Sequence, residues 1–248
     1  FITGSSGFIG FSSALNFVKL GFRVHGYDSI NKYYDQKLKF SRNKILKKYR
    51  NFSFTKGNLE NYKKIEKEII RFKPEIILHF AAQAGVRYSI SNSKEYLFSN
   101  IIGTYNILEI VKKLKVKHLL IASSSSVYGA NTSMPFKETD KADRQLSVYA
   151  STKKATENLA HSYSSLWNIS ITILRFFTVY GPWGRPDMAI FKFTKNILSK
   201  KKIDIYNKGK MYRDFTFIDD VVKSIELLIA KPPKKKSNKK FFADSLSN

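Results

Sequence analysis

The 248-residue sequence predicts an α/β fold, in which a doubly wound parallel sheet is followed by a smaller C-terminal cap. Three observations carry this prediction. Apolar strand segments alternate with helical segments as far as about residue 175, which is typical of β-α-β units. A glycine-rich turn joins the first strand to the first helix. Beyond Pro182 the sequence is rich in turns, with two helical segments and a short strand, which indicates a smaller mixed unit.

The glycine-rich turn reads Thr3-Gly4-Ser-Ser-Gly7-Phe-Ile-Gly10. Gly4 and Gly7 let the backbone turn tightly and approach a pyrophosphate, and Gly10 lets the helix pack close to the strand. The helix supplies free N–H groups for phosphates, and its period ends at Gly21, a residue type that commonly follows a last helical turn. Only a short apolar stretch precedes the turn, and the sequence does not start with Met. We therefore expect the sequence to begin inside the first strand.

The second strand, residues 22–28, ends in an acidic residue, Asp28. A strand, a glycine turn, a helix, a strand and an acid in this order form the fingerprint of a dinucleotide-binding unit. Asp28 is expected to accept hydrogen bonds from the adenosine ribose hydroxyls, which favours NAD over NADP. Arg23 precedes the strand end and is less suited to hold a 2′-phosphate. The alternative is a glycine-rich turn that binds no ligand.

The following segments continue the alternation of strands and helices. We expect a loop and a helix in 29–50, strands in 51–55, 74–82, 117–122 and 169–175, and helices in 60–72, 93–115 and 149–168. Ligands bind at the carboxyl ends of the strands in such sheets. Two segments occupy this position, residues 83–89 after one strand and residues 123–129, with four serines, after the next.

Tyr149 and Lys153 are four residues apart at the start of the helical segment 149–168. This spacing places both side chains on one helix face. An ammonium beside a phenol favours the phenolate, so we expect the pKa of Tyr149 to fall toward neutrality, and such a Tyr can act as a general base on an alcohol. The serines of 123–129 would line the same pocket. The alternative is a surface Tyr and Lys that happen to lie one turn apart.

The composition argues against several classes of protein. Cysteine is absent and the four His are scattered, so we expect no metal site and no disulfide-stabilised secreted domain. The sequence contains no signal peptide and no apolar run of about eighteen residues, which predicts a cytoplasmic protein without a membrane span. The net charge of +25 makes a nucleic-acid binder an alternative. Because the Lys are spread along the chain, with one dense run at 231–240, we instead expect solvated surface charge and no nucleic-acid partner.

Near residue 180 the alternation of strand and helix segments gives way to a turn-rich sequence, and this change predicts a domain boundary. We expect residues 1–178 to form the dinucleotide-binding domain and 179–248 to form part of a substrate-binding region, of which 214–230 returns to the first domain. Within that region we expect a helix in 191–201, a strand in 203–207 and a helix with Asp in its N-cap region after residue 214. The last residues complete no element, so we expect the C-terminal end to be incomplete as well.

These motifs together resemble the extended short-chain dehydrogenase/reductase family, and within it the nucleotide-sugar epimerases. The likeness extends over nearly the whole chain and consists of Thr3-Gly-x-x-Gly-x-x-Gly10, His79-Phe-Ala-Ala82, the stretch 123–129, Tyr149-x-x-x-Lys153 and Arg213-Asp214. The stretches 82–89, 177–182 and 184–189 look most like UDP-glucuronate 4-epimerases. The resemblance implies a Rossmann-type NAD-binding domain with a substrate-binding cap.

The resemblance also implies an activity, the NAD-dependent 4-epimerisation of a UDP-sugar through a transient 4-keto sugar, with UDP-glucuronate to UDP-galacturonate as the implied conversion. Tyr149 would remove the proton of the 4-hydroxyl, Ser124 would bond the same oxygen, and Lys153 would lower the Tyr149 pKa and hold the nicotinamide ribose. Besides Tyr149 and Lys153, the implied NAD contacts are Gly4, Gly7, Phe8, Ile9, Gly10, Asp28, Asn31, Asn58, Leu59, Ala81, Ala82, Gln83 and Asn100. The implied substrate contacts are Arg87, Ser125, Ser126, Thr178, Arg185, Tyr206 and Arg213.

Within the substrate set, the resemblance places Ser126 and Thr178 near the sugar C5 substituent, with Arg185 nearby. Tyr206 would hold the uracil, and Arg213 would pair with the diphosphate, whose oxygens suit a bidentate guanidinium. A 4-keto uronate is a β-keto acid and can lose CO2. We therefore hypothesise that Ser126 and Thr178 hold its carboxylate in an orientation that disfavours this loss.

The sequence departs from the family pattern and leaves alternatives open. Asn58 stands where the family usually has Asp, and the part of the cap with a second phosphate-binding Arg is absent. The alternatives are a UDP-glucose or UDP-N-acetylhexosamine 4-epimerase, a UDP-glucuronate decarboxylase and a non-catalytic NAD-binding module. A 4,6-dehydratase is less favoured, because this chain has serines where that chemistry needs an acidic pair. The resemblance also implies a homodimer, with 93–115 and 149–168 forming a four-helix bundle across a two-fold axis.

Overall fold

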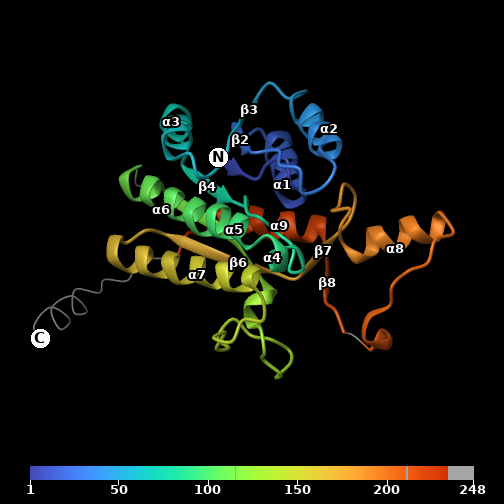
Figure 1. Ribbon diagram of the computed structural model, residues 1–248. Coiled ribbons are helices and arrows are strands. Elements are labelled where there is room, and N and C mark those ends of the chain that lie inside the picture. The colour runs from blue at the N-terminus through green and yellow to red at the C-terminus, as the bar shows by residue number, and fades with distance from the viewer. Residues whose placement is uncertain (115, 211, 234–248) are drawn as a thin grey trace, which may run out of the picture.

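Six parallel strands form one sheet in the order β3-β2-β1-β4-β5-β6 in the structure, a computed structural model that describes residues 1–114, 116–210 and 212–233 (Figure 1). The strands are β1 Ile2–Thr3, β2 Val24–Asp28, β3 Phe52–Lys56, β4 Ile76–His79, β5 His118–Ser124 and β6 Ile171–Phe176. The strand order reverses between β1 and β4, which is where ligands bind in such sheets. The doubly wound parallel fold predicted from the sequence is confirmed.

Helices cover both faces of the sheet (Figure 1). One face carries α1 Phe8–Lys19, α2 Gln36–Leu46 and α9 Ile218–Ile229, and the other carries α3 Tyr62–Phe72, α6 Gly103–Leu114 and α7 Val148–Trp167. Leu120 of β5 belongs to the first core together with Phe11, whereas its neighbour Leu119 belongs to the second together with Ile107. Successive strand residues point to opposite faces, so an uninterrupted apolar strand supplies both cores.

Helix α1 ends where the sequence predicted. Gly21 follows the C-cap Leu20 and has a φ of 86°. The Gly21 N–H donates to the Val18 carbonyl at 3.2 Å and the Phe22 N–H donates to the Phe17 carbonyl at 3.0 Å, which are the two bonds of a Schellman motif. The rings of Phe17 and Phe22 also pack edge to face at 5.5 Å. Glycine adopts this positive φ without steric cost, and the prediction is confirmed.

The long helical segment predicted over 93–115 is interrupted by a π-helix. It consists of α5 Ser93–Tyr96, the π-helix η1 Leu97–Ile102 and α6, and it is preceded by the short helix α4 Tyr88–Ser91. Asn100 of η1 is buried and bonds both main-chain groups of Gln83, accepting from its N–H at 2.7 Å and donating to its carbonyl at 3.1 Å. The π-helix therefore holds the segment that leaves β4, and π-helical turns frequently lie at functional sites.

The cap combines a small parallel sheet with a helix, α8, that stands away from the main body (Figure 1). Its elements are β7 Thr178–Tyr180, α8 Ala189–Leu198, the 3-10 helix η3 Tyr206–Gly209 and β8 Phe215–Phe217. Strand β7 pairs with β8, and α9 then leads back to α1, where the Asn16 side chain donates to Glu226 at 3.0 Å.

Two predictions for the cap need correction. The strand predicted in 203–207 is wrong, because Tyr206–Gly209 is a 3-10 helix and 201–205 has no regular structure. The partner of β7 is β8, and a strand needs a hydrogen-bonded neighbour to persist. The N-cap of α9 is Phe217, with no side-chain cap. Asp219 and Asp220 lie in the first turn instead, where their charges favour the helix dipole.

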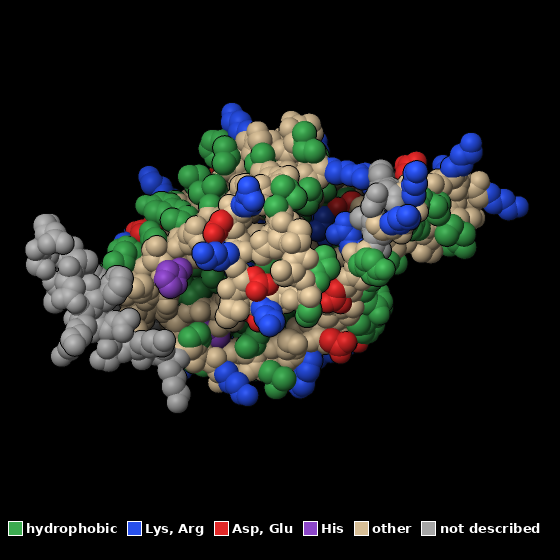
Figure 2. Space-filling view, turned by 90° about the horizontal axis from the view of Figure 1, so that it is seen from below, with side chains coloured by type: hydrophobic (Ala, Val, Ile, Leu, Met, Phe, Trp, Pro, Cys, Tyr) green, Lys and Arg blue, Asp and Glu red, His purple; other side chains and the backbone are tan. Residues whose placement is uncertain are grey.

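Among residues 1–114, 116–210 and 212–233, no helix combines the length and apolar character needed to cross a membrane. The same residues contain no group of three or more acidic or His side chains placed to hold a metal ion. Lys and Arg are scattered over the face in Figure 2, and several gather at the α8 end.

Candidate active site

A cavity of about 600 Å³ opens at the carboxyl ends of β1, β4 and β5. Its walls come from the glycine turn, the segments after these strands, the start of α7 and the cap. Most residues predicted as site residues line it, namely Gly4, Gly7, Phe8, Ile9, Gly10, Asp28, Asn31, Asn58, Leu59, Ala81, Ala82, Gln83, Arg87, Ser124, Ser125, Ser126, Tyr149, Lys153, Thr178, Arg185 and Arg213. Segments up to 209 residues apart in sequence therefore meet around one space.

The glycine turn is shaped for close approach by a ligand. Gly4 has a φ of 73°, and a Cβ on it would lie 2.7 Å from the Ala81 amide nitrogen. A Cβ on Gly10 would lie 2.1 Å from the Gly4 carbonyl oxygen, so only glycine lets α1 pack this close. The N-cap of α1 is Gly7, and no side chain caps the first turn. The N–H groups of that turn are left for an anionic ligand, which fits the pyrophosphate of a dinucleotide.

Asp28 lies at the end of β2 on the cavity wall. Its carboxylate accepts the N–H of Ser6 at 3.0 Å and the N–H of Ile30 at 2.7 Å. Burial raises the pKa of Asp28, and these two hydrogen bonds oppose the rise. Arg23 instead donates to the carbonyl at the end of α3 at 2.9 Å, so it takes no part in the cavity.

Tyr149 and Lys153 lie in the first turns of α7, and Ser124 lies at the end of β5. The Ser147 hydroxyl caps α7 by accepting the N–H three residues further on at 3.1 Å, which fixes where the helix begins. Lys153 is 6% exposed, and its ammonium donates to the Ala122 carbonyl of β5 at 2.8 Å. The helix start is thus tied to the strand end, and this brings Tyr149 within hydrogen-bonding reach of Ser124.

The prediction that Lys153 lowers the pKa of Tyr149 is wrong for this structure. Burial raises the pKa of the Tyr149 phenol, and the groups that oppose the rise are the Ser124 hydroxyl and the charge of Arg185. Burial also lowers the pKa of Lys153 to about 8, against the attraction of Glu157. The physical reason is that burial disfavours the charged phenolate more than the neighbouring groups favour it. Ser124 and Arg185 are therefore the groups that favour the phenolate.

Arg185 lies in the segment between β7 and α8 and forms an ion pair with Asp187, its Nε lying 3.1 Å from Oδ1. The other carboxylate oxygen of Asp187 accepts the Tyr33 hydroxyl at 3.0 Å. Burial disfavours the guanidinium charge, but Asp187 and the nearby phenols of Tyr33 and Tyr149 keep the pKa of Arg185 above its usual value. Arg185 is therefore a permanent cation held in place beside Tyr149.

Two predicted site residues need separate comment. Asn100 is 1% exposed and does not line the cavity, because its side chain is engaged with Gln83 and with the Thr152 hydroxyl at 3.0 Å. The contact between Asn100 and the cofactor stays a prediction, and in this structure Asn100 supports the cavity wall from behind. Tyr206 begins η3, and its side chain lies outside the described part of the chain.

Sequence analysis missed several polar residues that line the cavity, among them Tyr33, Lys39 and Asp187. Lys39 donates to the Asn31 carbonyl at 3.0 Å and to its side-chain oxygen at 2.6 Å, which orders the segment after β2. Tyr33 and Lys39 fall in a polar, basic stretch with no motif. Asp187 could have been predicted from the sequence, because it stands two residues after Arg185, a predicted site residue with which it can form an ion pair.

Residues 1–242 match the family described as NAD dependent epimerase/dehydratase. Protein CapI of Staphylococcus aureus is 54% identical over 93% of this chain and 69% of its own length. A probable UDP-glucuronate 4-epimerase of Rhizobium meliloti (strain 1021) is 49% identical over 94% of this chain and 68% of its own length.

A solved structure is also similar to this chain. It is the UDP-glucuronic acid 4-epimerase of Bacillus cereus in complex with UDP-glucuronic acid and NAD, with a TM-score of 0.87 and 33% identity, covering 94% of this chain and 73% of that one. This chain thus spans about two thirds of the length of the two curated relatives. The resemblance to nucleotide-sugar epimerases stated from the motifs is confirmed. Because the family match extends from the glycine turn past α9, this chain belongs to the NAD-dependent epimerase/dehydratase family.

Proposed function

We propose that this protein interconverts UDP-glucuronate and UDP-galacturonate by NAD-dependent 4-epimerisation. The observation that carries the proposal is the placement of Tyr149 beside Ser124 and Arg185 in a cavity whose other end is the glycine turn. One cavity thus holds a candidate base and a dinucleotide-binding loop. The Bacillus cereus enzyme, which was crystallised with UDP-glucuronic acid and NAD, supports the choice of substrate.

In the proposed reaction Tyr149 is the general base for the sugar 4-hydroxyl. NAD, when bound, would supply the hydride acceptor for C4 and the hydride donor for the opposite face of the 4-keto sugar. Ser124 donates a hydrogen bond that favours the phenolate, and Arg185 favours it through its positive charge. When the sugar is reduced again, Tyr149 returns the proton to the 4-oxygen. The same residue therefore acts as base and then as acid.

Lys153 and Asp28 are proposed to hold the two ribose groups of the cofactor. Lys153 spends one of its three N–H donors on the Ala122 carbonyl at 2.8 Å, which leaves donors for the hydroxyls of the nicotinamide ribose. Asp28 accepts two main-chain N–H groups and lines the cavity, so its free lone pairs suit the adenosine ribose. A carboxylate at that position repels a 2′-phosphate, which favours NAD.

The substrate is proposed to lie between the strand ends and the cap. Arg87 and Arg213 line the cavity and supply positive charge for a diphosphate. Ser126, Thr178 and Arg185 line it as well, and they are proposed to face the carboxylate at C5. We propose the division stated from the sequence, with 1–178 binding the cofactor, 179–248 contributing to the substrate site, and 214–230 packing back on the first domain.

We expect Ser126→Ala and Thr178→Ala to divert part of the turnover into decarboxylation. Each hydroxyl lost removes a hydrogen bond to a charged group, which is worth about 1.5–3 kcal/mol, so CO2 and pentose product should rise by about tenfold or more. Product ratios for UDP-glucuronate, measured by chromatography, test this for both single variants and the double variant. Epimerisation at the parent rate with no pentose formed would contradict the proposed role of these hydroxyls.

The function is tested by incubating the purified protein and NAD with UDP-glucuronate or with UDP-glucose and resolving the products. A mixture of UDP-glucuronate and UDP-galacturonate supports the proposal. Turnover of UDP-glucose alone favours the epimerase alternative with a neutral substrate, since such a sugar needs no cation beside C5. Release of CO2 as the main outcome indicates a decarboxylase. Bound NAD without turnover of either sugar indicates a non-catalytic module.

We also propose that the protein is a cytoplasmic homodimer built on η1, α6 and α7. Leu97, Phe98, Ile102, Leu166 and Trp167 on these helices are between 43% and 48% exposed, which is unusual for a stretch of large apolar side chains. Phe98→Asp is expected to convert the dimer to a monomer in sedimentation velocity. Leu20→Asp, which changes the exposed residue at the C-cap of α1, is the matched control and should stay dimeric. A monomeric parent protein at all concentrations would rule out this interface.

A further inference from the structure

Arg42 of α2 joins two segments that are far apart in the chain. Its side chain is fully buried. One terminal nitrogen donates to the Ser6 carbonyl of the glycine turn at 2.9 Å and to the Tyr34 hydroxyl at 2.8 Å. The other donates to the carbonyls of Trp183 and Gly184, the latter at 3.2 Å. A single guanidinium thus links the proposed cofactor loop with the segment that precedes Arg185.

The hydrogen-bond partners of Arg42 are three main-chain carbonyls and the Tyr34 hydroxyl. Among the described residues no carboxylate forms an ion pair with it, and its Nε has no hydrogen-bond partner. Burying a cation without a paired carboxylate is costly. The planar fork of donors, however, holds several carbonyls in one fixed geometry, which a lysine cannot do.

The segment held by Arg42 has a strained backbone. Trp183 has a φ of 63°, which is uncommon for a bulky residue and costs on the order of 1–3 kcal/mol. Such a conformation persists only where its surroundings fix it. Here the Trp183 carbonyl is bound by Arg42, and the Trp183 ring packs edge-on against Phe11 of α1 at 5.8 Å. Gly184 and then Arg185 follow directly.

We infer that Arg42 is a positioning residue, which couples the conformation of the glycine turn to the placement of Arg185 in the cavity. Ser6 lies between the two glycines that face the proposed pyrophosphate site, and Gly184 directly precedes Arg185. A ligand that orders the glycine turn therefore also orders the Trp183–Arg185 segment through one buried side chain. The effect on substrate rests on the proposed function, whereas the coupling between the two segments does not.

The coupling is measured by acrylamide quenching of Trp183 fluorescence in a Trp167→Phe background, which leaves one of the two tryptophans. NAD is expected to reduce the quenching constant of the protein with Arg42 by about twofold, since quenching follows the motion of the segment. With Arg42→Met the NAD effect should be lost, and with Arg42→Lys it should be reduced. Arg50→Met, a change to an exposed Arg beyond the end of α2, is the matched control and should behave like the parent.

Turnover supplies the second measurement. If Arg42 places Arg185 on the substrate, Arg42→Lys should raise the KM for UDP-glucuronate by about tenfold, with a smaller change in kcat. Circular dichroism and thermal melts identify loss of fold, and if Arg42→Met does not fold, Arg42→Lys decides. A folded Arg42→Lys with parental KM and parental NAD-dependent quenching would overturn the inference, as would a parent protein whose Trp183 does not respond to NAD. A protein that turns over no UDP-sugar but loses the NAD effect with Arg42→Lys would refute the proposed function and support the coupling.

Discussion

Tyr149→Phe is expected to lower kcat by about 10³-fold while leaving the fold and the NAD content unchanged, because general base catalysis contributes about 10²–10⁴-fold. The phenyl ring keeps the edge-to-face packing of Tyr149 on Tyr96, whose ring centroid lies 6.0 Å away. Only the hydroxyl that removes the substrate proton is lost. Initial rates with UDP-glucuronate, together with NAD released on denaturation, test both parts.

Tyr62→Phe is the matched control, because Tyr62 lies on α3 and bonds Glu66, away from the cavity. This variant should keep the parental kcat. Residual activity of Tyr149→Phe within about tenfold of the parent would assign the base to another group, since the loss would fall below the general-base range.

The pH dependence of the rate follows from the same site. Burial raises the pKa of Tyr149, so the phenolate fraction, and with it the rate, should increase as the pH rises toward that pKa. Arg185→Gln removes a charge that lowers the Tyr149 pKa. The rise in rate should therefore move to higher pH in this variant. The sequence pattern had instead assigned the lowering of the Tyr149 pKa to Lys153.

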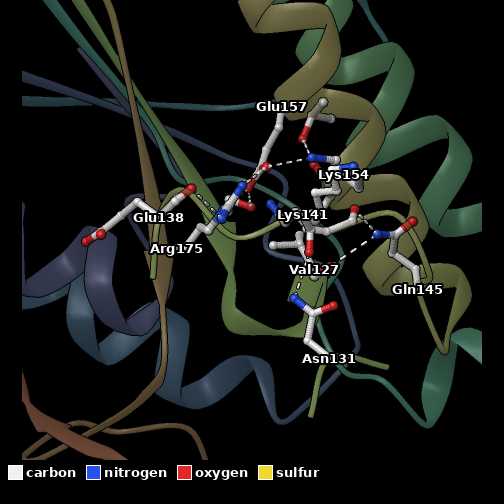
Figure 3. A network of polar contacts seen from close by, with 12 residues as sticks. Val127, Asn131, Glu138, Lys141, Gln145, Lys154, Glu157 and Arg175 are labelled. Atoms are coloured by element: carbon white, nitrogen blue, oxygen red, sulfur yellow. Dashed lines mark hydrogen bonds and ion pairs between the residues drawn. The ribbon is translucent and has the colours of Figure 1, made fainter. Parts of the chain in front are cut away.

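Arg175→Met is expected to lower the free energy of unfolding by about 3 kcal/mol, because it leaves a buried carboxylate without its main partner. Figure 3 shows Arg175 of β6 and Glu157 of α7 pointing toward each other. Two guanidinium nitrogens lie 2.9 Å from the two carboxylate oxygens, and Glu157 is 7% exposed. The Ser123 hydroxyl also donates to Glu157 at 2.6 Å. Urea titration followed by circular dichroism measures the loss.

The chain offers a matched control for this pair. Lys117 and Glu75 form an ion pair whose side chains are 72% and 70% exposed, so Lys117→Met should cost less than about 1 kcal/mol. The double variant Glu157→Leu, Arg175→Met should be more stable than Arg175→Met, since it leaves no unpaired charge. Equal losses for Arg175→Met and Lys117→Met would show that burial does not govern the stability of this pair.

Much of the fold could be predicted from the sequence, because the relevant interactions are local or periodic. The Gly21 end of α1 was predictable because a positive φ there favours glycine over other residues. The strands that became β4 and β5 were predictable because strands covered on both faces read as apolar runs. Gly4, Gly10 and Asp28 could be assigned to one site because their spacing follows from a β-α-β unit.

Other features were decided only by the tertiary structure. The π-helix around Asn100 and the absence of a strand in 203–207 depend on which segments pack beside them. The sequence pattern paired Tyr149 with Lys153, whereas the fold turns the Lys153 ammonium onto a β5 carbonyl.

The surroundings of Tyr149 show why sequence spacing could not decide its chemistry. Ser124 and Arg185, the groups that favour its phenolate, stand 25 residues before and 36 residues after it. Arg42, which reaches the segment before Arg185, is 141 residues from Trp183. The residue types and the local geometry of the site follow from the amino-acid sequence alone. The tertiary structure decided which charges and dipoles face one another, because electrostatic interactions depend on distance in space and on burial.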